Sequence, residues 1–348
     1  MEILYVFLED NFDMETSLLI PFEEIRNILK EILLKQGFIN EHADSIATIF
    51  TESNRDGYPS HGINRFPLFI RGIRRGYIKT DQVAVPLQTF GALERWDGQL
   101  GAGMLNARIC MQKAVSLASG YGIGCVALRN TNHWMRGGTY GWQAVDANFG
   151  AICWTNTTPN MPPWGGRKAH TGNNPLVIAI HGPDDIPLVL DMSLSQYSYG
   201  KLDTYKRAGE RLPFPGGLDE QGNMLYDPAN ILRTGQLLPI GLWKGSALSL
   251  ILDLMAALLS SGQTSLHIGR QSHEYGLSQV FIAFDLPRLI SDEVRNQLIH
   301  EVVEYYKASG TDVRFPGEQT LARREKAMRE GIAVDPGYWE EILQLSGR

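Results

Sequence analysis

Apolar residues recur at helical spacing near the N-terminus and form short continuous runs through the middle of the chain. From Ile25 to Leu33 they follow the pattern of one helix face, and Gly37 stands where a glycine C-cap falls. A second helix is predicted from about Asn40, and a third contains Phe66 and Ile70. The chain therefore opens with helices.

Strand and helix patterns alternate through the middle of the chain. Helices are predicted over 105–118 and 245–259, and strands over 123–128, 150–154, 176–180, 188–190 and 279–284. Residues 201–223 combine glycine, proline and many charges, which predicts a long surface loop. The alternation predicts an α/β fold with a largely parallel or mixed sheet.

These patterns divide the chain into three parts. Residues 1–80 are predicted to be helical, residues 81–300 to form a central α/β domain, and residues 301–348 to form helices that pack back on the N-terminal ones. Residues 1–13 do not fit the helical pattern that follows. We interpret them as a possible extension, with Met14 as an alternative start.

Composition narrows the class of protein. The 348 residues are 43% hydrophobic and 20% charged, as in an ordinary globular protein, and the net charge of −6 argues against nucleic-acid binding. The cysteines at 110, 125 and 153 are odd in number and lack metal-ligand spacing, so we expect no metal site and a reducing cytoplasm. We also expect no membrane span, which needs about 18 apolar residues, and no signal peptide in the run 3–8.

Two loops that follow predicted strands concentrate polar, aromatic and glycine residues. The first is Asn130–Gln143, which contains Asn132 and His133, and the second is Thr155–Gly166. Loops at strand ends commonly build ligand pockets, so we expect one site for a small polar ligand. The alternative is a tight turn that happens to contain a histidine.

Ser60 and His61 form a second candidate. They follow a proline turn, and Arg65 lies one helical turn later on the same face. A histidine transfers protons near neutral pH, and an arginine binds a carboxylate through two parallel hydrogen bonds. Together they suit a carboxylate-bearing substrate whose neighbouring carbonyl needs a proton. The alternative is that Ser60 caps a helix and His61 is an ordinary first-turn residue.

Motifs of several other enzyme classes are absent from the sequence. Residues 120–124 resemble a dinucleotide fingerprint, but the third glycine is misplaced and the segment stands between a helix and a strand. No P-loop, nucleophile elbow or His-Glu-x-x-His motif occurs. Asp191 at a strand end and Lys244 at a helix start are weak local signals for a nucleotide, and Gly317 indicates only a turn.

Six segments, taken in order, resemble one family. They are Ser60-His61-Gly62, Asn132-His133, Gly172-Asn173-Asn174-Pro175, Asp191-Met192-Ser193, Lys244-Gly245-Ser246 and Pro316-Gly317-Glu318. Together they resemble the type-2 malate/L-lactate dehydrogenase family, from about Pro21 to the C-terminus. Segments 133–138, 140–144, 161–165 and 198–200 look closest to the members that reduce 2,3-diketo-L-gulonate.

The resemblance implies a fold, a cofactor site and an assembly. The implied fold is an NAD(P)-binding central α/β domain unlike the Rossmann fold, with a helical part built from both termini, in a cytoplasmic homodimer. The implied cofactor contacts are Pro187, Leu188, Val189, Leu190, Asp191, Met192, Ser193, Trp243, Lys244, Gly317, Glu318 and Gln319. The last three stand where related members have Gly-His-Glu.

The implied reaction is the reduction of 2,3-diketo-L-gulonate to 3-dehydro-L-gulonate with NADH. The resemblance makes His61, as an imidazolium, the proton donor, and Arg65 the group that holds the carboxylate. His133 is a rival for the catalytic role, because some relatives use the equivalent residue as the acid. We expect Ser60 and Asn132 to contact the sugar-acid substrate. Malate, lactate or ureidoglycolate are alternative substrates, and a non-catalytic sugar-acid binding protein is an alternative function.

Further expectations concern the pocket, the cofactor and the assembly. Trp134 and Trp164 are expected to wall the pocket, and Arg136 and Gln143 to make it large and polar. Asp191 is expected to favour NADH by repelling a 2′-phosphate. Four basic residues nearby in the sequence oppose this, namely Lys201, Lys206, Arg207 and Arg211. Apolar faces on the terminal helices predict a dimer.

Overall fold

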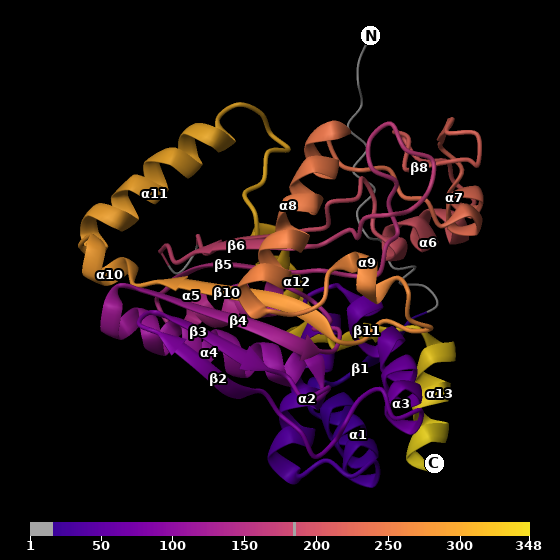
Figure 1. The fold of residues 1–348 in the computed structure, drawn as a ribbon, viewed down its shortest axis with the longest axis horizontal. Helices are drawn as coiled ribbons and strands as arrows, with labels where there is room; N and C mark the ends of the chain where they lie inside the picture. The colour runs from indigo at the N-terminus through magenta and orange to yellow at the C-terminus, as the bar shows by residue number, and fades with distance from the viewer. Residues whose placement is uncertain (1–16, 184–185) are drawn as a thin grey trace.

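A seven-stranded sheet forms the centre of the protein in a computed structural model that describes residues 17–183 and 186–348 (Figure 1). The extension proposed at residues 1–13 lies outside the described residues. In their order across the sheet, the strands are β2 (Val85–Phe90), β3 (Leu93–Asp97), β4 (Ile123–Thr131), β10 (Leu277–Phe284), β5 (Gly150–Thr155), β6 (Leu176–Ile180) and β7 (Leu188–Met192).

The sheet is mixed rather than largely parallel. Among the strands described, β3 and β4 are the one parallel pair, and the other five neighbouring pairs are antiparallel. β10 lies between β4 and β5, with Phe281 opposite Val126 on one side and Cys153 on the other. The predicted α/β class is confirmed, and of the two predicted sheet arrangements the mixed one is correct.

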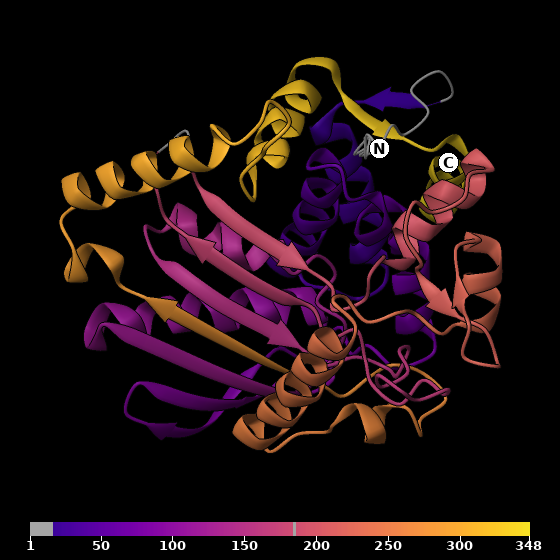
Figure 2. The same cartoon turned by 90° about the horizontal axis from the view of Figure 1, so that it is seen from above.

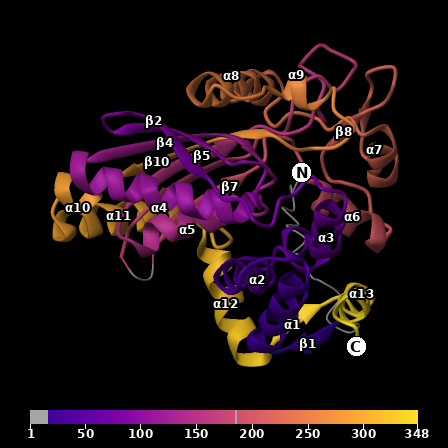
Figure 3. The ribbon, with the colours of Figure 1, turned by 60° about the horizontal axis from the view of Figure 1, so that its bottom comes forward.

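Helices cover both faces of the sheet (Figure 3). α4 (Gly103–Tyr121) and α5 (Gly138–Asp146) pack on one face, and α8 (Trp243–Ser260) packs on the other. Because side chains alternate along a strand, Val126 and Leu128 of β4 face α4, whereas Ala127 faces α8. Burial on both faces explains why β4 and β5 are nearly continuous apolar runs.

The two ends of the described chain build one helical core, which lies below the sheet in Figure 1. α1 (Phe22–Lys35), α2 (Asn40–Arg55) and α3 (Phe66–Arg74) share this core with α13 (Pro336–Ser346), and β1 (Leu18–Ile20) pairs with β11 (Ile332–Val334). Two 3₁₀ turns, η1 (Pro59–His61) and η2 (Ile63–Arg65), connect α2 to α3. The domain boundaries proposed after residues 80 and 300 stay a prediction.

The remaining elements lie around the sheet and the helical core. α11 (Asp292–Lys307) runs along the β7 edge, where Ile299 and Val303 pack against Ile186 (Figure 2). The others are α6 (Tyr199–Ala208), β8 (Gly217–Leu218), β9 (Met224–Leu225), α7 (Pro228–Thr234), α9 (Ser265–Ile268), α10 (Leu286–Leu289) and α12 (Glu318–Glu330).

Three segments differ from their predicted structure. Residues 201–223 are not one long loop, because α6 extends through Ala208 and buries Leu202 and Tyr205. α5 begins inside the segment predicted to be a loop after β4. The β2–β3 hairpin was not predicted at all. Every residue of β2 is exposed, so β2 has no alternation of buried and exposed positions.

Among the described residues, exposed apolar side chains are densest on α8 and α11, and the terminal helical parts, where they were predicted, also expose some, such as Leu34, Ile39 and Leu68. Five residues on the outer face of α8 are 41–73% exposed: Leu250, Ile251, Leu254, Met255 and Leu258. By length and composition α8 is also apolar enough to cross a membrane, contrary to the prediction that no run would be. Its inner face packs on the sheet through Leu252 and Ala256.

Candidate active site

Two histidines from distant parts of the sequence lie side by side. His61 ends η1, and His133 lies in the turn that follows β4. Their rings stack with centroids 5.9 Å apart and planes 19° from parallel, and both residues are half-buried. The structure therefore brings the two predicted catalytic histidines into one site.

The turn around His133 determines which ring nitrogen carries its proton. The Met135 backbone N–H donates to His133 Nδ1 over 2.9 Å, so a neutral His133 holds its proton on Nε2. Met135 has a φ of 64°, a left-handed conformation that is uncommon for a residue with a side chain. Such strain persists where the surrounding structure holds it, and here it directs a donor at the histidine.

Arg65, the last residue of η2, lies close to both histidines, and its charge lowers the pKa of each ring. Within residues 17–183 and 186–348, no carboxylate forms an ion pair with its guanidinium. A half-buried guanidinium without a carboxylate partner favours the binding of an anion. The predicted carboxylate clamp is therefore available for a ligand.

Both histidines are neutral at neutral pH. Burial is the main reason that the pKa of His61 is lowered to about 3, and His133, Arg65 and Arg136 lower it further. Burial, and then the charge of Arg65, lower the pKa of His133 to about 3. This differs from the expectation that His61 is an imidazolium. An anion on Arg65 removes one cause of the shift and so favours the protonated ring.

Comparison with known proteins identifies the family. A model of the malate/L-lactate dehydrogenase family matches residues 20–343. The chain is 40% identical over 332 residues to 2,3-diketo-L-gulonate reductases from Citrobacter koseri and Klebsiella pneumoniae, which covers 94% of this chain and 99% of each relative. The chain belongs to the malate/L-lactate dehydrogenase family.

A solved structure supports the same conclusion. Sulfolactate dehydrogenase from Methanocaldococcus jannaschii superposes with a TM-score of 0.87 at 27% identity, over 95% of this chain and 97% of that chain. The resemblance inferred from six sequence segments is therefore confirmed. This dehydrogenase is an oxidoreductase that depends on a pyridine nucleotide.

The three predicted cofactor segments of the dehydrogenase lie along one edge of the sheet. β7 is the edge strand, and its Val189 N–H donates to Pro316 O over 2.9 Å, which places Gly317 beside it. At the other end of β7, Ile240 N–H donates to Leu194 O, just before Trp243 and Lys244. Five strand residues span about 17 Å, a length that suits an extended dinucleotide.

At one end of β7 the side chains are exposed, and at the other end they are held by hydrogen bonds. Trp243 is 61% exposed and Lys244 is also exposed, so an aromatic face and a cation are available to a nucleotide. At the other end, Glu318 accepts from Lys307 Nζ (2.6 Å) and from the Phe315 N–H (3.2 Å). A Cβ on Gly317 would lie 3.0 Å from Pro187 O, so this close approach requires glycine.

Asp191 faces into the protein rather than toward a ribose. Its Oδ2 accepts from the Gly138 N–H at the start of α5 over 2.7 Å. Burial raises the pKa of this carboxyl, and Arg136 and the Gly138 hydrogen bond partly counteract that rise. The argument that Asp191 selects NADH through ribose hydroxyls is therefore not supported by its geometry.

The two predicted substrate contacts, Ser60 and Asn132, differ in whether their side chains are already used by the fold. Ser60 Oγ lies 3.4 Å from His61 Nδ1, and a Cβ on Gly200 at the start of α6 would come within 2.8 Å of it. By contrast, Asn132 Nδ2 donates to the carbonyl oxygens of Tyr77, Leu100 and Gly101. The amide nitrogen of Asn132 thus holds the histidine loop, and a substrate contact by this residue stays a prediction.

Three side chains predicted to shape the pocket are used by the fold. Trp134 is 1% exposed and packs in the core against Tyr140 and Phe281, so it does not wall a pocket. Arg136 is buried in an ion pair with Asp56. Gln143 Nε2 donates to a backbone carbonyl of α4 over 3.0 Å. Trp134 and Arg136 therefore do not line a pocket as predicted, whereas Gln143 lines a separate cavity together with Arg324.

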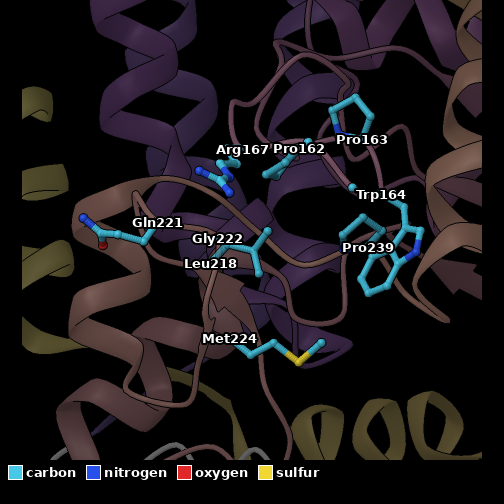
Figure 4. Close-up of a pocket in the computed structure, with 11 residues that line it drawn as sticks. Pro162, Pro163, Trp164, Arg167, Leu218, Gln221, Gly222, Met224 and Pro239 are labelled. Carbon is cyan, nitrogen blue, oxygen red and sulfur yellow. The ribbon is translucent and has the colours of Figure 1, made fainter.

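Trp164 lines a separate surface groove (Figure 4). The groove has a volume of about 300 Å³, and neither histidine is among the described residues that line it. Trp164 and Pro239 form one side of the groove, and Arg167 lies on the other. The Trp164 backbone N–H donates to Ser246 Oγ over 2.9 Å. This hydrogen bond attaches the groove to the first turn of α8, beside Trp243.

Ser195, which helps to support the end of β7, was not predicted from the sequence, whereas Asn173 and Ser193 lie in the segments that resemble the family. Asn173 Nδ2 donates to Ser193 Oγ over 2.9 Å, and Ser193 Oγ lies 2.7 Å from Ser195 Oγ. The Ser-x-Ser spacing directly after an apolar strand was the available signal, because alternate residues share a face there. The ion pair between Asp56 and Arg136 could not be predicted, because the sequence around Asp56 indicated only a turn.

Proposed function

We propose that this dehydrogenase reduces 2,3-diketo-L-gulonate to 3-dehydro-L-gulonate with NADH. The observation that carries the proposal is Arg65, a guanidinium without a carboxylate partner in the described chain, beside the stacked pair His61 and His133. A 2-oxo acid presents a carboxylate next to a carbonyl, which matches this arrangement. The relatives named 2,3-diketo-L-gulonate reductase, which match over 94% of the chain, support this substrate.

The site residues have separate tasks in the proposed reaction. Arg65 binds the carboxylate through two parallel hydrogen bonds and places the C2 carbonyl beside the histidines. His133 holds the bound substrate by donating from Nε2 to the ground-state carbonyl oxygen, because Met135 occupies Nδ1. With Arg65 neutralised by the carboxylate, His61 takes up a proton and transfers it to the same oxygen as that oxygen gains charge. Bound NADH supplies the hydride to C2.

β7, Trp243, Lys244 and Gly317 to Gln319 would hold the cofactor along the sheet edge. A preference for NADH over NADPH is supported by Arg207, one of the four basic residues that lie close to Asp191 in the sequence. Arg207 is paired with Asp203 (2.8 Å) and Asp335 (3.1 Å), so it is not free for a 2′-phosphate. Equal kcat/KM with the two cofactors would contradict this part of the proposal.

We further propose that two copies associate through the outer face of α8 in the cytoplasm. Exposed apolar side chains from Leu250 to Leu258 would be covered by a second copy. Light scattering should give twice the mass of one chain, and Leu254→Glu should yield the single mass. The three cysteines at 110, 125 and 153 are unpaired, which suits a reducing compartment.

One assay tests the substrate assignment. Oxidation of NADH is followed at 340 nm with 2,3-diketogulonate, pyruvate, oxaloacetate and other 2-oxo acids at matched concentrations. The proposal predicts the highest kcat/KM with 2,3-diketogulonate. A higher value with pyruvate or oxaloacetate would instead make lactate or malate the product, with the same residue roles.

A further inference from the structure

A buried carboxylate collects arginines from three separate elements near the histidines. Asp56, at the end of α2, is 1% exposed. It accepts from Arg55 Nε (2.9 Å), from Arg324 of α12 through both oxygens (2.8 Å each) and from Arg136 Nη1. Although burial raises the pKa of the Asp56 carboxyl, these guanidiniums lower it below its ordinary value.

Arg136 is the member of this cluster that reaches the active site. It is 3% exposed, stacks 4.1 Å from the Tyr58 ring centroid, and lies in the same turn as His133. Among the described residues, its Nε has no hydrogen-bond partner. A Cβ on Gly138 would meet both this Nε (3.3 Å) and Asp191 Oδ2 (2.9 Å), so Arg136 also lies near β7.

We propose that Asp56 and Arg136 form a positioning pair for the proposed reaction, in which Asp56 holds the Arg136 guanidinium beside His61 and anchors the turn that carries His133. This inference rests on the proposed roles of the two histidines. Asp56 and Arg136 are 80 residues apart, and their ion pair joins the end of α2 to the loop before α5. Neither residue is required to touch the substrate.

The protonation of His61 depends on the charged groups that face it. These are Arg65 of η2 and Arg136 from the turn after β4; His133 of that turn and the Ser60 hydroxyl also face His61, and both are uncharged at neutral pH. In the proposed reaction the carboxylate of the substrate pairs with Arg65, whereas Arg136 is already buried in its ion pair with Asp56. Arg136 is therefore the fixed positive charge that continues to oppose protonation of His61 when substrate is bound.

Arg324 offers a matched control. Like Arg136 it pairs with Asp56, and it also stacks on an aromatic ring, 4.0 Å from the Trp142 centroid. It lines a polar cavity of about 380 Å³, so water can enter if its side chain is shortened. Its charge is not among those that shift His61. Removal of Arg324 therefore weakens the cluster and leaves the charge beside His61 in place.

The experiment compares Arg136→Met, Arg136→Lys and Arg324→Met with the unmodified chain. The pH profile of kcat/KM for 2-oxo acid reduction reports the pKa of the free enzyme's acid. We expect Arg136→Met to move the descending limb up by about one pH unit, because one nearby positive charge is lost. Arg136→Lys should restore most of the original profile, and Arg324→Met should lower thermal stability without moving the limb.

A second readout separates this inference from the proposed reaction. Histidine-ring NMR shifts, followed from pH 8 downward without substrate, report protonation of His61 even if the enzyme turns over a different acid. His61 should begin to titrate about one unit higher in Arg136→Met than in Arg324→Met. Identical titration in these two variants, or an equal shift of their kinetic limbs, would overturn the positioning role.

Discussion

Replacing Arg65 by methionine should separate substrate binding from proton transfer. Methionine preserves much of the side-chain volume and removes the charge. A pair of charge-assisted hydrogen bonds to a carboxylate contributes about 3 kcal/mol or more, which corresponds to roughly a 100-fold rise in KM for the 2-oxo acid. Binding of the cofactor along β7 should change little, because Arg65 lies in η2 and not in the three cofactor segments.

Arg65→Met should also favour protonation of the histidines, an effect that opposes the loss of substrate binding. Arg65 is a cause of the lowered pKa of both His61 and His133, so its removal raises the pKa of both rings. At saturating substrate the descending limb of kcat should therefore move to higher pH, even though KM is worse. Arg65→Lys keeps the charge and loses the planar fork, so it should raise KM without moving the limb.

The assay is NADH oxidation at 340 nm over a range of substrate concentrations and pH values. Arg71→Met is the matched control, because Arg71 is an exposed arginine on α3 whose ion pair with Glu341 lies away from the histidines. That control should leave KM and the pH profile unchanged. If Arg65→Met changed KM by less than threefold, Arg65 would not be the carboxylate clamp and the proposed substrate pose would be wrong.

Three further outcomes are expected. His61→Asn should lower kcat by roughly 10²- to 10⁴-fold, whereas His133→Asn should act mainly on KM; the reverse pattern in steady-state kinetics would exchange their roles. The free energy of unfolding should fall as pH drops from about 6.5 toward 3, because the unfolded histidines bind protons that the folded ones do not. The slope of this free energy against pH is at most about 1.4 kcal/mol per pH unit for each ring. Urea melts of His61→Gln/His133→Gln should show a shallower slope. Gly317→Ala should weaken NADH binding in fluorescence titrations, because its φ of 103° and the nearby Pro187 carbonyl both oppose a Cβ.

Local sequence patterns predicted the elements that are buried on both faces. β4 and β5 are apolar runs because α4 and α5 cover one side of the sheet and α8 the other. Strand order could not follow from such patterns, since β10 enters between β4 and β5 from more than 100 residues away. α5 was missed for a related reason. Its glycine-rich start is stabilised by Asp191, a residue 53 positions further along the chain.

The same limit applied to the candidate site. The motif around His133 identified a loop rich in chemistry but could not separate residues that face a ligand from residues that hold the loop. Asn132, Trp134 and Arg136 all have partners inside the protein, in three carbonyls, an aromatic cluster and Asp56. Arg65 has no carboxylate partner in the described chain. Its guanidinium is half-buried and therefore remains available to pair with the carboxylate of a ligand.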